Sequence, residues 1–170
     1  YLDHVSSMPN AGSFTTARIG SEELLLVRDK HDVIRGFHNV CSHRAHQMVK
    51  PGTSGTRPVL LCPNHAWTYK LDGTLYKARK AAGQPEFDPI EFGLKQVRVE
   101  NFNGLIFGSL DRNAASLFDS LRAPELGDHM AANIPGMDRM RLAPEGKVEK
   151  EVAANWKCLV DNFLECYHCD

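Results

Sequence analysis

Two short motifs, each of which pairs a cysteine with a histidine, constrain this chain more than any other feature. The motifs are Cys41-x-His43 and Cys62-x-x-His65, and eighteen residues separate His43 from Cys62. A thiolate and an imidazole one or two residues apart can reach one metal centre from a single loop. Four ligands require two such loops. We therefore expect a fold whose strands bring the two motifs together.

The sequence around the motifs predicts short strands and tight turns. Asp72-Gly73 and Asn103-Gly104 are hairpin-turn signals, and Pro51-Gly52 marks a loop between the motifs. This pattern predicts a mainly β fold made of small antiparallel sheets. The expected strands are Ser13–Ile19, Glu23–Arg28, Val33–His38, Pro58–Leu61, Leu94–Val99 and Leu105–Leu110.

The pattern changes after Leu110, so we expect one domain over residues 1–115 and a linker with an incomplete second domain over residues 116–170. Ala114–Arg122 predicts a short helix, and Lys147–Ala153 predicts a strand that leads into the second domain. These would be the first α/β elements of that domain.

Asn155–Cys169 predicts a longer helix, because its apolar residues recur at i, i+3, i+4 and i+7. Trp156 and Phe163 are expected to anchor a core on that face, and Cys158 to pack beside them.

Composition narrows the class of protein. The chain has 170 residues, a formal net charge of −1 and 42% hydrophobic residues, which suits a globular protein with a proper core. The near-neutral charge gives no reason to expect nucleic acid or a membrane surface as partner. No apolar run approaches the roughly 18–20 residues that cross a bilayer, and no secretion signal is visible. Five cysteines, an odd number, favour a cytoplasmic metal protein over a disulfide framework.

The two motifs fit a two-iron centre. In a Rieske [2Fe–2S] cluster two cysteines hold one iron and two histidines hold the other. We therefore predict Cys41, His43, Cys62 and His65 as the cluster ligands. A Cys₂His₂ set can also bind zinc, although zinc modules more often pair Cys with Cys. Unliganded core residues are the third alternative, and His46 is expected to lie near the site or at the surface.

With Arg44 and Trp67, the two motifs resemble the Rieske domain of ring-hydroxylating oxygenase alpha subunits. The similarity covers residues 24–110 and resumes at residue 155. The respiratory type of Rieske protein has a disulfide beneath its cluster, which His46 and Asn64 exclude here. That type also has a hydroxyl donor where Trp67 stands. Fewer hydrogen bonds to the cluster predict a reduction potential of roughly −150 mV, near the low end of the Rieske range.

The same resemblance extends to the expected C-terminal helix. It implies that His168 is the first ligand of a mononuclear non-haem Fe(II), with the other ligands outside this chain. It also implies that Glu165 bridges the two metal centres, meeting His65 of a neighbouring subunit in a homotrimer. Without the motifs upstream, Asp161, Glu165 and His168 would be interpreted as the polar face of a helix.

The resemblance also implies a function. A reductase would pass electrons from NAD(P)H through the cluster to an iron that activates O₂ and hydroxylates a small substrate. Residues 163–169 and the second motif look most similar to the quaternary-ammonium branch, which acts on carnitine, glycine betaine, choline or proline betaine. The alternatives are an aromatic-ring dioxygenase, a stand-alone Rieske ferredoxin and a structural zinc module.

Overall fold

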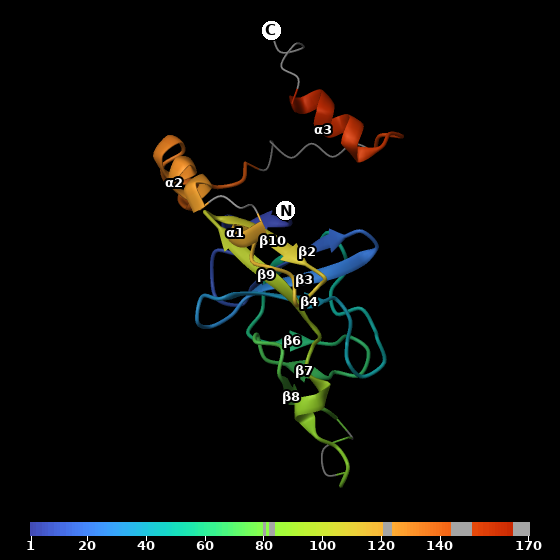
Figure 1. Cartoon of the computed structure of the whole chain (residues 1–170). Helices are drawn as coiled ribbons and strands as arrows, with labels where there is room; N and C mark the ends of the chain where they lie inside the picture. The colour runs from blue at the N-terminus through green and yellow to red at the C-terminus, as the bar shows by residue number, and fades with distance from the viewer. Residues whose placement is uncertain (80, 82–83, 121–123, 144–150, 165–170) are drawn as a thin grey trace.

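A computed structural model describes residues 1–79, 81, 84–120, 124–143 and 151–164. Strands dominate residues 1–110, and helices follow (Figure 1). The strands are β1 (Asp3–His4), β2 (Ser13–Ile19), β3 (Glu22–Arg28), β4 (Ile34–His38), β5 (Gly55–Thr56), β6 (Leu60–Leu61), β7 (Thr68–Tyr69), β8 (Leu75–Lys77), β9 (Gln96–Phe102) and β10 (Leu105–Ser109). The helices are α1 (Leu117–Ser120), α2 (Pro124–Asn133) and α3 (Trp156–Leu164), with 3₁₀ turns at Val5–Ser7, Pro89–Phe92 and Met137–Arg139.

The described strands form two antiparallel sheets. The larger has seven strands in the order β1-β10-β9-β4-β3-β2-β5, and the smaller has the order β6-β7-β8. The mainly β class expected from the sequence is confirmed. One sheet is larger than expected because β4 pairs with β9, through Gly36↔Val97 and Phe37↔Gln96, and so joins two smaller sets of strands.

Strand β3 shows why this sequence forms the centre of the larger sheet. Successive side chains of a strand point to opposite faces, and four consecutive apolar residues of β3 are fully buried. Leu25 and Val27 pack into the core that contains both motif cysteines, whereas Leu26 packs with Met8 and Ile106 on the opposite face. A strand covered on both faces reads as a continuous apolar run, as this one does.

Both hairpin signals are confirmed. Asn103 and Gly104 connect β9 to β10 with positive φ angles of 48° and 89°, as a tight hairpin requires. Gly73 lies between β7 and β8 with a φ of 86°, and a Cβ there would stand 2.3 Å from the Phe37 ring. Glycine is therefore needed at Gly73 for conformation and for space.

Several expected elements differ from the structure. Pro58–Leu61 forms a strand only at Leu60–Leu61, and Leu94–Val99 is displaced to Gln96–Phe102. The expectation of a strand at Lys147–Ala153 is wrong for residues 151–153, because the structure pairs them with no described strand; the rest lies outside the described residues. The short strands β1, β5, β7 and β8 were not expected.

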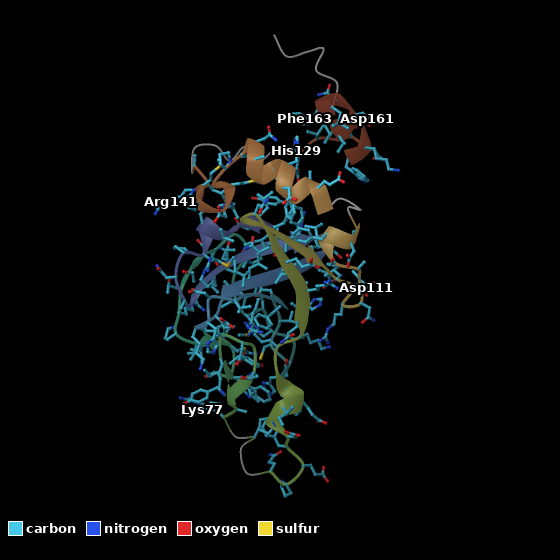
Figure 2. The ribbon with its side chains drawn as sticks, turned by 60° about the vertical axis from the view of Figure 1, so that its left-hand side comes forward. Lys77, Asp111, His129, Arg141, Asp161 and Phe163 are labelled. Carbon is cyan, nitrogen blue, oxygen red and sulfur yellow. The ribbon has the colours of Figure 1, made fainter. Side chains whose placement is uncertain are left out.

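The C-terminal helix forms, but its apolar face is open. Helix α3 confirms the first part of Asn155–Cys169, and the remainder lies outside the described residues. Trp156 is 66% exposed, Phe163 is 77% exposed and Cys158 is exposed, so they pack against no core among the described residues, and their role as core anchors stays a prediction. Figures 1 and 2 show α3 apart from the sheets, and no described residue covers its apolar face.

Within the described ranges, no helix combines the length and the apolar character that a membrane span needs.

Candidate metal centre

The two motifs occupy two loops of the same design. Residues 41–46 are enclosed by the bridge Val40↔Gln47, and residues 62–67 by the pair Leu61↔Thr68. In each loop the cysteine N–H donates to the carbonyl five residues later, at 2.8 Å, and the cysteine carbonyl accepts from the alanine four residues later. These alanines, Ala45 and Ala66, have left-handed φ angles of 51° and 56°. The same backbone turn therefore presents both motifs.

A buried amide closes the base of the first loop. Asn39, just before the loop, donates its side-chain N–H to the Val49 carbonyl at 2.7 Å and accepts from the Val49 N–H at 3.0 Å. The Ser42 hydroxyl donates to the Gly93 carbonyl at 2.6 Å. Asn39 and Val49 are buried. These bonds hold the first loop in place from both sides, through residues far away in the sequence.

The two thiols lie together inside the core. Cys41 and Cys62 are each 2% exposed, and neither forms a disulfide. Burial raises the pKa of the Cys41 thiol, and the adjacent Cys62 thiol raises it further. Hydrogen bonds from Tyr69 and from the His43 backbone lower this pKa, but the net shift is upward. Both thiols must lose their protons to bind a metal. The bound metal would therefore replace two protons at a buried site.

Tyr69 links the two loops. Its hydroxyl lies 3.1 Å from the Cys41 sulfur and 3.2 Å from the Ser42 nitrogen, whose N–H donates to it. Burial, and then the Cys41 thiol, raise the pKa of Tyr69 above its ordinary value. The phenol therefore stays protonated and can donate its hydrogen to a Cys41 thiolate.

The two imidazoles lie together at the outer side of the site. The rings of His43 and His65 are 4.9 Å apart between centroids, at an interplanar angle of 78°. The buried Trp67 ring stacks on His43 at 4.7 Å and 11°, which orients that imidazole. Burial lowers the pKa of His43, and the charges of His65 and Arg44 lower it too. His43 is half-buried, whereas His65 is exposed.

This donor set fits a [2Fe–2S] cluster. Two buried thiols form one pair, and two imidazoles nearer the surface form another, as a centre with two different irons requires. Among the described residues, no three His, Cys, Asp or Glu side chains surround a single point as the ligands of one ion do. The loops supply one thiol and one imidazole each.

The structure places Cys41 beside Cys62 and His43 beside His65, and that these four residues hold one cluster stays a prediction. His46 is exposed and contributes only its carbonyl to the first loop. Glu165 and His168 lie outside the described residues.

Sequence reasoning missed Asn39 and Tyr69. The signal for Tyr69, on β7, was its position two residues after Trp67, since residues two apart in extended backbone point to the same face. Asn39 gave no such signal, because its partner Val49 follows the first motif at no standard spacing.

Comparisons with known proteins agree with this geometry. The Rieske [2Fe–2S] domain family matches residues 1–96, and the catalytic domain of ring-hydroxylating alpha subunits matches residues 139–170. The chain is 40% identical over 166 residues to the carnitine monooxygenase oxygenase subunit of Escherichia coli K12, which covers 98% of this chain and 43% of that protein. It is 36% identical over 170 residues to the glycine betaine monooxygenase oxygenase subunit of Chromohalobacter salexigens, covering 100% of this chain and 36% of that protein.

A solved structure shows the same fold. The crystal structure of a quaternary ammonium Rieske monooxygenase in complex with its substrate L-carnitine superposes with a TM-score of 0.87 at 34% identity. The match covers 98% of this chain and 46% of that one. The chain thus spans less than half the length of the relatives that it matches.

Proposed function

The chain belongs to the Rieske [2Fe–2S] domain family, and from this premise we propose that it is the N-terminal part of an oxygenase alpha subunit that hydroxylates quaternary ammonium compounds. The paired loops carry the proposal, since they place two thiols and two imidazoles at one site. Residues 1–115 would form the Rieske domain, and residues 116–170 the linker and the start of the catalytic domain.

Cys41 and Cys62 would hold one iron of the cluster, and His43 and His65 the other. A bound cluster supplies reversible transfer of one electron. The protein side chains do the rest: the core shields the two thiolates from water, Tyr69 donates a hydrogen bond to Cys41, and Trp67 holds the His43 ring in one orientation. The exposed His65 is available to a second protein surface.

The substrate class rests on the relatives, which are named for carnitine and glycine betaine. Hydroxylation of an N-methyl group in such a cation would release formaldehyde and the demethylated amine. We also propose an NAD(P)H-dependent reductase as electron source, O₂ as co-substrate, a cytoplasmic homotrimer, and His168 as a ligand of the catalytic Fe(II).

The cluster is tested first, on the full-length protein. We expect red-brown protein with two sulfides and three irons per chain, two irons in the cluster and one at the catalytic site. His43→Ala should lose this colour, whereas His46→Ala, at an exposed histidine in the same loop, should keep it. Colourless protein that holds one zinc at Cys41 and Cys62 would rule out the proposal.

The bridging role of Glu165 is tested separately. Glu165→Gln should leave the cluster spectrum intact and sharply reduce formaldehyde release from carnitine or glycine betaine. Asp161→Asn, four residues earlier in the sequence, is the matched control and should keep turnover. Wild-type turnover in Glu165→Gln would show that the carboxylate forms no bridge.

A further inference from the structure

We propose that a basic surface beside Cys62 binds an acidic one-electron carrier protein, an inference that rests on the proposed function. We call it the Lys50 surface and define it by Lys50, Arg57, Val59, Leu61, Pro63 and Lys70.

Two grooves meet to form the Lys50 surface. One, with a volume of about 670 Å³, runs past Lys50, Arg57, Leu61 and Pro63. The other, of about 330 Å³, contains Lys70. They share Pro58 and Val59, so the surface is continuous from the first groove to the second.

Cations outnumber carboxylates along this surface. No carboxylate is among the described residues that line the larger groove, whereas Lys50 and Arg57 both line it and are exposed. The smaller groove has three cations, Lys30, Arg35 and Lys70, and two carboxylates. Asp29 is 1% exposed and accepts a 2.7 Å hydrogen bond from Arg35, and Asp72 also lines the third groove described below. On a chain with a net charge of −1, such a local excess of cations favours an anionic partner.

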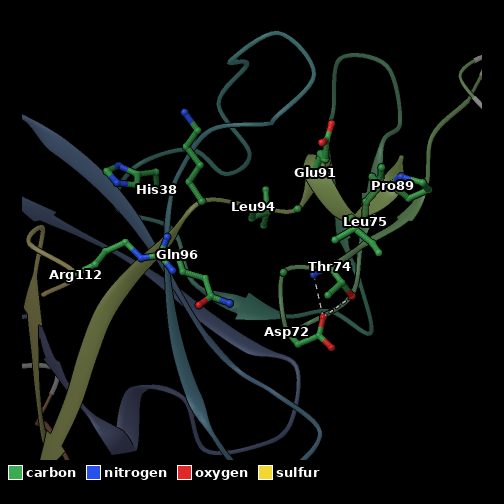
Figure 3. A pocket seen from close by; sticks show the side chains of 13 residues that line it. His38, Asp72, Thr74, Leu75, Pro89, Glu91, Leu94, Gln96 and Arg112 are labelled. Atoms are coloured by element: carbon green, nitrogen blue, oxygen red, sulfur yellow. Dashed lines mark hydrogen bonds between the residues drawn. The ribbon is translucent and has the colours of Figure 1, made fainter. Parts of the chain in front are cut away.

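A third groove provides the contrast (Figure 3). It has a volume of about 620 Å³ and carries both signs of charge, with Lys95 and Arg112 beside Asp72 and Glu91. The Asp72 carboxylate accepts hydrogen bonds there from the Thr74 hydroxyl and N–H, which Figure 3 draws. Mixed charge gives no preference for a partner of one sign.

The Lys50 surface also has the make-up of a protein interface. It combines exposed cations with apolar residues, namely Val59, Leu61, which is 45% exposed, and Pro63. Transient interfaces combine an apolar centre with a charged rim that sets the rate of association. A small anion alone would not need the apolar residues.

The Lys50 surface borders Cys62. Leu61 and Pro63 are the two neighbours of Cys62 along the chain, so a protein seated on them lies against a cluster ligand. Under the proposed function the exposed His65 faces another subunit, and a donor needs a second approach. The electron count is simple: the carrier is oxidised by one electron, the centre beside Cys62 is reduced by one, and no covalent bond breaks.

The test uses the full-length protein and a plant-type [2Fe–2S] ferredoxin, an acidic carrier whose potential lies below that of a Rieske centre. Lys50→Glu with Lys70→Glu should weaken ferredoxin binding and slow its reduction of the protein by roughly tenfold at low salt. Reduction by the cationic radical of methyl viologen should be unchanged or faster. Lys95→Glu, in the mixed groove, is the matched control and should change neither rate.

A covalent readout is independent of electron transfer. A carbodiimide should join the Lys50 amine to ferredoxin carboxylates, and mass spectrometry should find that amide. Lys50→Arg keeps the charge but offers no amine, so it should lose the cross-link and keep the binding.

The outcomes separate this inference from the proposed function. Loss of the red-brown spectrum in the wild-type protein would remove the proposed function itself. If the spectrum is intact and Lys50→Glu/Lys70→Glu binds ferredoxin as tightly as Lys95→Glu does, the Lys50 surface alone is overturned. A change of oligomeric state in Lys50→Glu/Lys70→Glu would also overturn it, by showing that the face joins copies of this chain.

Discussion

The two ligand loops share one backbone turn but are supported differently. Residues 41–46 are fixed from outside by the bond from Ser42 to Gly93 and by Tyr69, and Asn39 joins the segments before and after them through its bonds to Val49. Residues 62–67 receive, among the described residues, one side-chain hydrogen bond from outside, from Thr68 to the Ala66 carbonyl. Their support is the packing of Trp67. The first loop is held by polar bonds and the second by one aromatic ring.

This difference matches the exposure of the two histidines. His43 lies half-buried between Trp67 and His65, whereas His65 is exposed. A rigid inner ligand and an accessible outer ligand suit a centre that must keep its geometry while meeting a partner surface. Four sets of substitutions test the two kinds of support.

Trp67→Ala should have the largest effect, because it removes the ring that packs against His43, Phe87 and Phe92. Truncating a buried aromatic side chain costs about 4 kcal/mol. We expect the second loop to loosen and the cluster to bleach at lower guanidinium concentration, followed by visible absorption. Trp67→Phe should restore most of the stability. Equal midpoints for Trp67→Ala and the wild type would disprove aromatic support.

Asn39→Ala tests the polar support of the first loop. It leaves the buried Val49 N–H and carbonyl without their amide partners, at a cost of about 3 kcal/mol. The same bleaching experiment should show a large loss, with earlier release of iron. Asn101→Ala, at the β9–β10 turn far along the sheet from the loops, is the control and should leave bleaching unchanged.

Tyr69→Phe tests the link between the loops through the reduction potential. The phenol donates to Cys41, and such a bond is stronger to the more negative, reduced cluster. A preference of about 1 kcal/mol corresponds to roughly 40 mV for one electron. We expect the potential of Tyr69→Phe to fall by that amount in a potentiometric titration. An unchanged or higher potential would contradict the hydrogen bond.

Ala45→Gly and Ala66→Gly test what the loops have in common. Both alanines have left-handed φ angles, which glycine adopts without the cost that a Cβ imposes. Glycine also raises the entropy of the unfolded chain, which offsets part of this gain. Each change should therefore stabilise the protein by about 0.5 kcal/mol. Denaturant midpoints should rise equally for both. A rise in only one would show that the two turns are not equivalent.

The sequence by itself determined a large part of this protein. The two Cys–His motifs predicted the paired loops, and the pattern of short strands predicted β2, β3 and β10. The Asp72-Gly73 and Asn103-Gly104 pairs predicted the β7–β8 and β9–β10 turns. All of these are local signals. They depend on side-chain chemistry and on the period of a strand, which can be recognised within a few residues.

Only the tertiary structure decided how the site is supported. Tyr69 reaches Cys41 across 28 positions of sequence, and Trp67 stacks on His43 of the other loop. The pairing of β4 with β9, and so the size of the larger sheet, was equally invisible. Such contacts depend on how strands far apart in the chain align. No local pattern encodes that alignment, because burial against the whole core selects it.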